Sequence, residues 1–230
     1  MGISERRERE REELRTRIIE AARDLMSAEG LAGLSMRAIA ERIEYSPATI
    51  YLYFRDKEEI IQEVVAAGFR RLGEAMEASI RAAGPKADVM EQYAATGRAY
   101  ARFALENTAY FRVMFELPSV AKVHAQDCAE QAARAEEAED VGAECFDVVA
   151  KLAEKAAEER LLRVANPAFA PLIGWGLVHG ITSLYLSGRL AGRVDTPEAF
   201  LALVEEAIES LSFGMRSADG VLHDAGVARP

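Results

Sequence analysis

The sequence predicts an all-α protein with an N-terminal three-helix helix-turn-helix domain and a C-terminal helical bundle. Of its 230 residues, 50% are hydrophobic and 29% are charged, as is usual for a globular protein. Ala, Glu, Leu and Arg are abundant, while Thr and Pro are scarce, and this balance favours helix. Apolar residues recur at spacings of three and four, and no segment of strand length alternates apolar with polar residues. We therefore expect no sheet.

The N-terminal segment predicts one amphipathic helix with a charged extension. Residues 5–17 alternate acids and bases, which fits either a solvated helix extension or a loose arm, and we assign 1–11 to a flexible arm. Apolar residues then recur at helical spacing from Leu14 to Leu25. We expect this helix to end at Gly30, because glycine is common just after helix C-termini.

Two short helices follow with clear start signals. Ser35 predicts the N-cap of a helix over 36–43. Ser46-Pro47 predicts a third helix that runs to about Phe54, since serine caps well and proline suits the first helical position. A long helix and two short ones with a tight turn between the last two match the helix-turn-helix layout. Such motifs bind double-stranded DNA.

A long helix connects this motif to the rest of the chain. Asp56 is expected to cap it, and Ala83-Gly84-Pro85 is expected to end it. We predict further helices over 87–106, 108–116, 119–163 (divided near its middle), 168–187 and 197–215. The domain limits that follow are 1–58 for the DNA-binding domain, 59–216 for a ligand-binding and dimerisation domain, and 217–230 for a frayed tail.

The charge distribution is compatible with nucleic acid despite a net charge of −10. Residues 1–58 carry 11 Lys and Arg against 12 Asp and Glu, whereas the remaining residues carry 17 against 26. The acidity therefore belongs to the body, and the head has basic side chains that can face phosphates.

The cysteines and the apolar segments predict a reduced, cytoplasmic protein that does not enter a membrane. Cys128 and Cys145 form no CxxC pair, and we expect idle thiols rather than a disulfide. The N-terminus lacks the apolar run of a signal peptide. Residues 164–188 carry no Asp, Glu, Lys or Arg, but they include two prolines and several polar residues. A helix buried in a bundle or a dimer interface explains them better than a membrane span.

No arrangement of residues predicts catalysis. The histidines, His124, His179 and His223, are scattered without metal-ligand spacing. The sequence contains no GxSxG motif, no P-loop and no GxGxxG motif after a strand. We expect no enzyme, no cofactor and no metal.

Two runs in the head carry a specific resemblance. Residues 35–42 (SMRAIAER) and 46–60 (SPATIYLYFRDKEEI) resemble the DNA-binding domain of the TetR family of transcriptional regulators, over about residues 12–65. The resemblance implies that Tyr51 and Lys57 contact phosphates and that neighbouring residues lie at the DNA surface. The DNA-binding residues expected on this basis are Arg37, Ser46, Pro47, Ala48, Thr49, Tyr51, Tyr53 and Lys57.

The body resembles a TetR subgroup named for its Trp-His-Gly motif. The segments concerned are 110–115 (YFRVMF) and 175–180 (WGLVHG). The resemblance implies a small-molecule effector in the body and a homodimer that reads a palindromic operator. Aromatic and polar residues suggest a pocket, although core packing predicts the same residues. The pocket set is Tyr100, Phe103, Tyr110, Phe111, Met114, Trp175 and His179. The expected dimer stripe is Leu201, Val204, Ile208 and Leu211, although this stripe could also pack within one chain.

One residue departs from the family pattern. Glu44 occupies the turn position where the family usually has glycine, and a left-handed residue other than glycine costs about 1–2 kcal/mol. Either the turn has another conformation or the domain tolerates the strain. The implied mechanism is repression that ends when effector binding shifts the fourth helix, with Gly68 and Gly73 easing a bend. The alternative is a helical ligand-binding or scaffold protein that has lost DNA binding.

Overall fold

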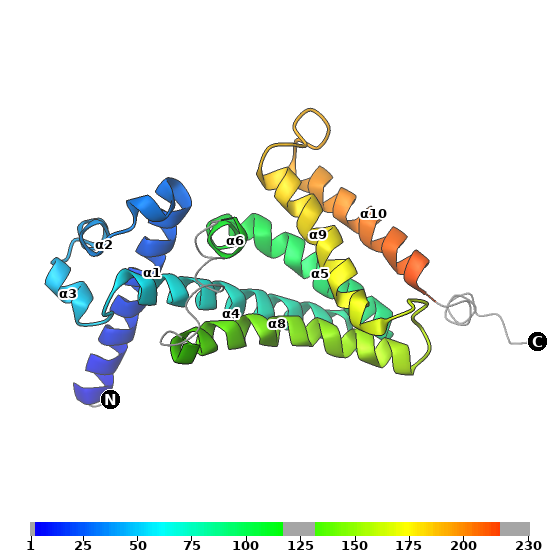
Figure 1. Cartoon of the computed structure of the whole chain (residues 1–230), viewed down its shortest axis with the longest axis horizontal. Coiled ribbons are helices and arrows are strands. Elements are labelled where there is room, and N and C mark those ends of the chain that lie inside the picture. The colour runs from blue at the N-terminus through cyan, green and yellow to red at the C-terminus, as the bar shows by residue number, and fades with distance from the viewer. Residues whose placement is uncertain (1–2, 117–131, 217–230) are drawn as a thin grey trace, which may run out of the picture. The chain divides into compact units, whose positions relative to one another are not determined.

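The computed structural model describes residues 3–116 and 132–216, which form helices joined by turns and loops, with no strand among them (Figure 1). The predicted all-α fold class is confirmed. The elements are α1 (Ile3–Gly33), α2 (Met36–Ile43), α3 (Pro47–Tyr51), α4 (Lys57–Ala83), α5 (Val89–Glu106), α6 (Thr108–Phe115), α8 (Ala132–Glu158), the 3-10 turn η1 (Pro167–Phe169), α9 (Ala170–Leu186) and α10 (Pro197–Met215).

The chain divides into two compact units. Unit 1 comprises Met1–Phe69 with Ala109–Gly142, and unit 2 comprises Arg70–Thr108 with Ala143–Pro230. Both α4 and α8 contribute residues to each unit. The predicted functional limits at 58/59 and 216/217 stay predictions, since contact-based units and functional domains need not coincide.

The predicted helix starts in unit 1 are confirmed by their side-chain caps. Ser35 Oγ accepts a hydrogen bond from Ala38 N (3.1 Å), and Ser46 Oγ accepts one from Thr49 N (3.2 Å). Asp56 Oδ1 accepts one from Glu59 N at 2.8 Å, at the start of α4. Each cap satisfies a backbone donor that the first helical turn leaves without a partner. The caps therefore fix where the short helices begin.

The core of the head is formed by apolar side chains from several helices. Ile18 of α1, Ile39 of α2 and Ile50 of α3 are fully buried, as the spacing predicts. Ala40 is also fully buried, in the helix that packs against both α1 and α3. A larger side chain at Ala40 would separate these helices. The head thus holds α3 against a well-packed helical support.

Three boundaries in the head differ from the prediction. Residues 3–11, which we assigned to a flexible arm, form the first turns of α1, where an Arg6–Glu10 ion pair at i,i+4 supports the helix. Gly30 breaks the helix with φ 70°, as expected of a left-handed glycine, but a further helical turn continues to Gly33. At the other end, α3 stops at Tyr51, and residues 52–54 follow it outside the helix.

Glu44 adopts the left-handed conformation that the family pattern reserves for glycine, with φ 62° and ψ 42°. Tyr45 N donates to Ala40 O (2.9 Å), and Glu44 N donates to Glu41 O (3.3 Å), which together make a Schellman C-cap. Arg17 Nη2 donates to Ile43 O at 3.2 Å. These bonds hold the turn in the usual geometry, so the domain keeps the turn and carries the backbone strain.

We expect Glu44→Gly to stabilise the head by about 0.5–1 kcal/mol. Glycine removes a left-handed cost of about 1–2 kcal/mol, and the greater freedom of the unfolded glycine chain offsets part of that gain. The change in the free energy of unfolding is measured by chemical denaturation that is monitored through the amide hydrogen exchange of residues 18–64. Glu41→Gly, in right-handed α2, is the matched control and should lose about 1 kcal/mol. Destabilisation by both substitutions would contradict the strain assigned to Glu44.

Helix α6 packs on α4 within unit 1 through a glycine contact. A Cβ atom added at Gly68 would meet the Met114 and Tyr110 side chains, so glycine at this position permits close approach. Phe115 packs edge-on against Phe69, with ring centroids 5.8 Å apart. Helix α4 continues through Gly68, and close packing is a sufficient reason for this glycine. The hinge role assigned to Gly68 and Gly73 stays a prediction.

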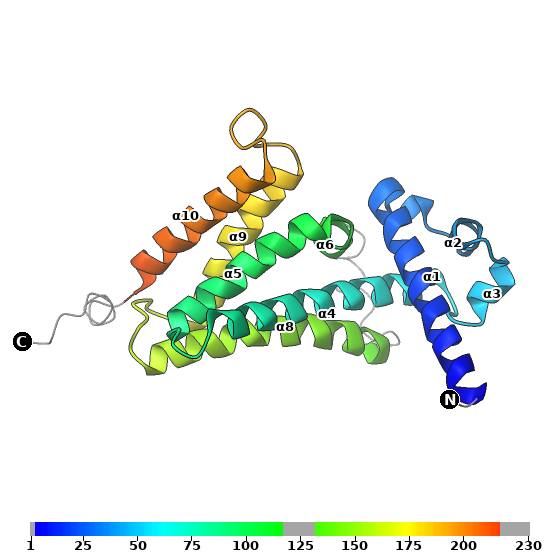
Figure 2. The same ribbon diagram turned by 180° about the vertical axis from the view of Figure 1, so that it is seen from behind.

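Unit 2 contains a helix triplet in which α5, α9 and α10 pack against one another (Figure 2). A Cβ atom at Gly97 of α5 would lie 3.0 Å from Ile208 Cδ1 and 3.4 Å from Val178 Cγ1. Tyr93 Oη donates a 2.6 Å hydrogen bond to Ala170 O, and burial raises the pKa of Tyr93 to about 12. The small residue at Gly97 therefore sets how closely the three helices approach.

The middle of the body is only partly as predicted. Within the predicted 119–163 segment, α8 begins at Ala132 and ends at Glu158, and Arg160 adopts a left-handed φ of 58°. Residues 117–131, with His124 and Cys128, lie outside the described residues, as do His223 and the predicted tail 217–230. Cys145 is a free, buried thiol 3.8 Å from Met76 Sδ, and burial raises its pKa to about 11.

Candidate nucleic-acid interface and polar cluster

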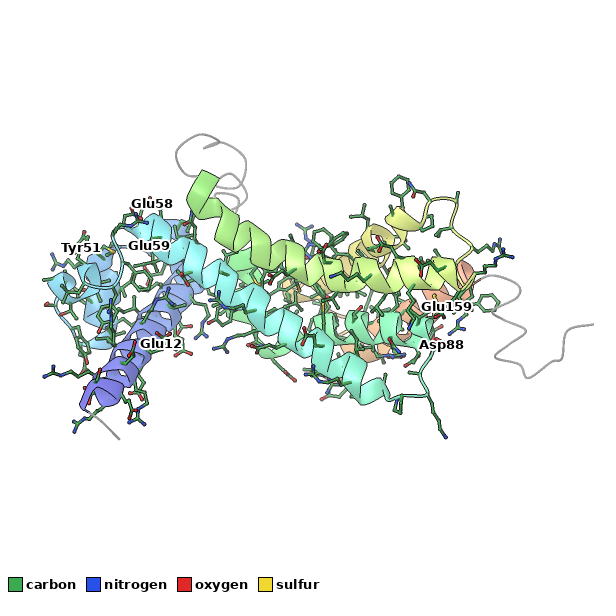
Figure 3. The ribbon with its side chains drawn as sticks, turned by 90° about the horizontal axis from the view of Figure 1, so that it is seen from below. Glu12, Tyr51, Glu58, Glu59, Asp88 and Glu159 are labelled. Atoms are coloured by element: carbon green, nitrogen blue, oxygen red, sulfur yellow. The ribbon has the colours of Figure 1, made fainter. Side chains whose placement is uncertain are left out.

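Helix α3 and its N-cap Ser46 contain five of the eight predicted DNA-binding residues, in unit 1. Ser46, Pro47 and Ala48 are exposed, and 57% of Tyr51 is exposed. Figure 3 shows Tyr51 at the edge of the head, with Glu58 and Glu59 at the start of α4. Because Ile50 faces the core, the side chains on the opposite side of α3 are left to contact a partner.

The remaining predicted residues lie around α3 in the same unit. Arg37 of α2 is exposed, and its hydrogen bond to Glu41 (Nε to Oε1, 2.8 Å) raises the pKa of its guanidinium. Lys57, the first residue of α4, is exposed, with its Nζ 4.0 Å from Glu58 Oε1. Thr49 and Tyr53 are both half-buried. The structure thus gathers these residues on one unit, with cationic groups on the elements before and after α3.

Two exposed residues in this region were not among those predicted from the sequence. Tyr45, in the turn before α3, lies under Arg17, whose Cζ is 5.4 Å from the ring centroid. Leu52, just after α3, is 76% exposed. The spacing of the apolar residues could have indicated the exposure of Leu52, because it leaves this residue off the buried face of α3.

Three of the predicted pocket residues form a hydrogen-bonded cluster in unit 2. Tyr100 Oη lies 2.7 Å from His179 Nδ1, and Trp175 Nε1 donates to Tyr100 Oη at 3.4 Å. Ser183 Oγ lies 3.4 Å from His179 Nε2. Since Trp175 can only donate, a consistent arrangement has Tyr100 donating to His179 Nδ1 and His179 Nε2–H donating to Ser183. The cluster joins α5 to α9 by polar contacts.

Burial controls the charge of this cluster. Desolvation lowers the pKa of His179, so the imidazole is neutral at neutral pH. Desolvation likewise raises the pKa of Tyr100, which stays protonated. A neutral, hydrogen-bonded cluster suits an uncharged polar group on a ligand better than an ion.

We expect unit 2 to lose stability on acidification through His179. The folded-state pKa lies below the unfolded value of about 6.5, so the unfolded chain binds the proton more readily. The contribution of His179 is therefore present above about pH 6.5 and is lost as the pH falls through the folded-state pKa. Denaturation monitored by the fluorescence of Trp175, the sole tryptophan, measures it. His179→Gln should flatten the acid slope, and equal slopes for both proteins would contradict the assignment.

The other predicted pocket residues are buried side chains. Phe103 is buried in unit 2. Tyr110, Phe111 and Met114 belong to α6 in unit 1, and Arg23 lies over the Tyr110 ring at 4.9 Å from its centroid. These aromatic residues act as core in the structure, which was the simpler of the two interpretations of the sequence. Their pocket role stays a prediction.

The predicted dimer stripe on α10 is largely turned inward. Val204 is 2% exposed and Ile208 is 5% exposed, because both pack within unit 2. Leu201 and Leu211 are half-buried. Because Val204 and Ile208 are buried, they are not on the surface of the single chain. This agrees with the alternative that the stripe packs within one chain. The large apolar side chains that remain exposed in this region are Phe169, Leu172, Ile173, Trp175, Leu184 and Phe213.

Helix α9 is the most apolar helix of unit 2. With η1 it forms the segment Pro167–Leu186, which has the length and composition to cross a membrane, and only 22% of its most apolar window is buried. In the structure α9 packs on both α5 and α10. Residues 3–116 and 132–216 contain no group of His, Cys, Asp and Glu arranged to hold a metal ion.

Comparisons with known proteins identify both parts of the chain. Residues 18–64 match the family described as "Bacterial regulatory proteins, tetR family", and residues 93–211 match "Tetracyclin repressor-like, C-terminal domain". The chain is 43% identical over 51 residues to the HTH-type transcriptional regulator UidR of Escherichia coli (strain K12), a match that covers 22% of this chain and 26% of that protein. The chain thus aligns with about a quarter of the length of the curated relatives it matches.

Solved structures share the fold over almost the whole chain. A TetR-family regulatory protein from Rhodococcus RHA1 has a TM-score of 0.65 at 19% identity and covers 86% of this chain and 96% of its own. The TetR-family regulator PfmR from Thermus thermophilus has a TM-score of 0.61 at 20% identity, with 84% and 97% covered. The Trp-His-Gly subgroup stays a prediction, because the C-terminal match carries a more general description. With both of its domains matched, the chain belongs to the TetR family of bacterial regulatory proteins.

Proposed function

We propose that the protein is a cytoplasmic, non-catalytic repressor that binds a palindromic operator as a homodimer and releases it when a small molecule binds. Family membership makes it a transcriptional regulator with a helix-turn-helix. The observation that carries the DNA-binding part is the exposed face of α3, capped by Ser46 and flanked by Arg37 and Lys57. Backbone N–H groups at the starts of α3 and α4, with these cations, suit phosphate oxygens.

The exposed apolar side of α9 supports the dimer. Gly176 and Gly180 lie one turn apart on α9, and no atom of residues 3–116 and 132–216 lies within 4 Å of a Cβ added at either, so this side of the helix is open among these residues. Leu172 and Leu184 continue the same side at spacings of four, and both are more than 40% exposed. A second copy seated here would bury them, and the glycines would let two helices approach closely. A two-fold dimer then presents two heads to a palindrome.

The dimer is tested by sedimentation equilibrium. Leu172→Glu with Leu184→Glu places two carboxylates in the proposed interface and should shift the protein to the monomer. Lys151→Glu, exposed on α8, is the control and should stay dimeric. Monomeric wild-type protein at micromolar concentration would overturn the homodimer.

The polar cluster supports effector binding in the body. Tyr100, His179 and Trp175 provide donors and acceptors within an apolar helix layer, the combination that small-molecule sites use. A ligand that displaced one of these bonds would change the packing of α5 against α9. Such a ligand regulates the protein only if it binds the DNA-bound and free states with different affinities.

Selection from fragmented genomic DNA tests the DNA-binding proposal. Wild-type protein should enrich one or a few fragments with an inverted repeat. Tyr51→Ala and Lys57→Ala should each weaken binding to them by about tenfold, whereas Lys151→Ala on α8 should not. Equal, weak retention of all fragments by every protein would leave a helical ligand-binding scaffold as the function. The retained turn geometry at Glu44 argues against that alternative.

A further inference from the structure

The N-terminal half of α1 lines a groove of about 500 Å³ in unit 1. One wall is a side of α1 that carries Arg7, Arg11 and Arg17, and the other wall is formed by Tyr45 and Tyr53. The two tyrosines flank α3, since one lies in the turn before it and the other lies just after it. The groove is therefore continuous with both ends of the helix proposed to read DNA.

The donor groups of the groove are held in place by ring contacts. Arg17 Cζ is 5.4 Å from the Tyr45 ring centroid, and Arg11 Cζ is 6.0 Å from that of Tyr53. A guanidinium over an aromatic face keeps its N–H donors directed outward in its own plane, where a phosphate can bind. Arg17 is anchored further by its hydrogen bond to Ile43 O. The groove thus offers guanidinium donors that are ordered before any partner binds.

Two carboxylates moderate the positive charge. Glu10 and Glu13 also line the groove, and Glu10 is paired with Arg6, with Arg6 Nε 2.7 Å from Glu10 Oε1. Three guanidinium groups against two carboxylates leave a net charge of only about +1. This is a weak site for a free anion. It is suited instead to a phosphate that is already held nearby by other contacts, for which the effective concentration is high.

We propose that this groove binds a backbone phosphate of the operator DNA, which extends the contact surface from α3 to the charged N-terminal half of α1. The inference rests on the proposed DNA-binding function and assigns it residues outside the two short helices: Arg7, Arg11, Arg17 and Tyr45. The part of α1 that we had predicted to be a flexible arm then acts as a rigid, preorganised contact.

The test uses two full-length single variants with the same loss of charge on the same helix. Arg11→Gln removes a groove donor, and Arg9→Gln removes an arginine that does not line the groove. Affinity for the selected fragment is measured at several salt concentrations, and phosphate-ethylation interference maps the phosphates that each protein requires. Lys57→Ala is included to report on the contact made by α4.

The groove variant should bind about fivefold to tenfold more weakly, and its slope of log K against log salt should be shallower by about 0.9 for each phosphate that it no longer neutralises. Interference at the groove phosphate should also disappear, while the pattern around α3 stays the same. If Arg11→Gln and Arg9→Gln behave alike and only Lys57→Ala weakens binding, the groove inference is overturned and the proposed function stands. If wild-type protein selects no fragment, both are overturned.

Discussion

Phe54→Ala should cost the head about 3–5 kcal/mol of folding free energy and abolish operator binding. Phe54 is 2% exposed, lies shortly after α3, and packs under Arg15, whose Cζ is 5.3 Å from the ring centroid. Removing the ring leaves a cavity behind the helix proposed to read DNA. The expected destabilisation is a large part of the roughly 5–15 kcal/mol that usually stabilises a domain.

Leu52→Ala provides the matched control for Phe54. It removes an apolar side chain two residues away, but Leu52 is 76% exposed, so the stability change should stay within about 0.5 kcal/mol. Hydrogen exchange of amides in residues 18–64 measures the head alone, which avoids treating the whole chain as a two-state system. Equal protection in both variants would contradict the packing assigned to Phe54.

Gly97→Leu should loosen the triplet of α5, α9 and α10 by about 1–3 kcal/mol through overpacking. The added side chain would begin within 3.0 Å of Ile208 Cδ1 and 3.4 Å of Val178 Cγ1, so α9 and α10 must move away from α5. This displacement also strains the bond between Tyr100 and His179. We expect a lower midpoint of denaturation and an altered Trp175 fluorescence.

Gly73→Ala is the control for Gly97→Leu, because it changes helix propensity without overpacking a helix contact. Within the described part of the chain, a Cβ atom at Gly73 of α4 meets Cys145 Sγ alone, at 4.0 Å, which is an ordinary contact. Alanine there should stabilise the helix by about 0.5–1 kcal/mol, because a glycine inside a helix is unfavourable. If Gly97→Leu also stabilised the protein, α5, α9 and α10 would not be in close contact at this position.

The sequence predicted the head more fully than the body because the head is determined by local signals. Ser35, Ser46 and Asp56 each fix a helix start through a bond within three residues, and the structure has each of these caps. The exposed face of α3 follows once Ile50 is assigned to the core. Local chemistry of this kind does not depend on how distant segments pack.

The body depends on long-range packing, which spacing alone does not determine. The stripe that includes Val204 and Ile208 was compatible with a dimer or with internal packing, and burial within unit 2 favours the latter. Similarly, the aromatic residues of α6 and those of α9 could not be assigned to one pocket or to two cores. The groove on α1 was missed because it is formed by side chains far apart in the sequence, such as Arg17 and Tyr45.

The central claim is that the head recognises a DNA sequence. The most direct measurement compares the affinity of the wild-type protein for the selected inverted repeat with its affinity for a scrambled repeat, across a range of salt concentrations. We predict binding to the repeat at least about 10³-fold tighter than to the scrambled DNA, with both affinities falling as salt rises. Equal affinities for the two DNAs at every salt concentration would contradict sequence recognition by the head.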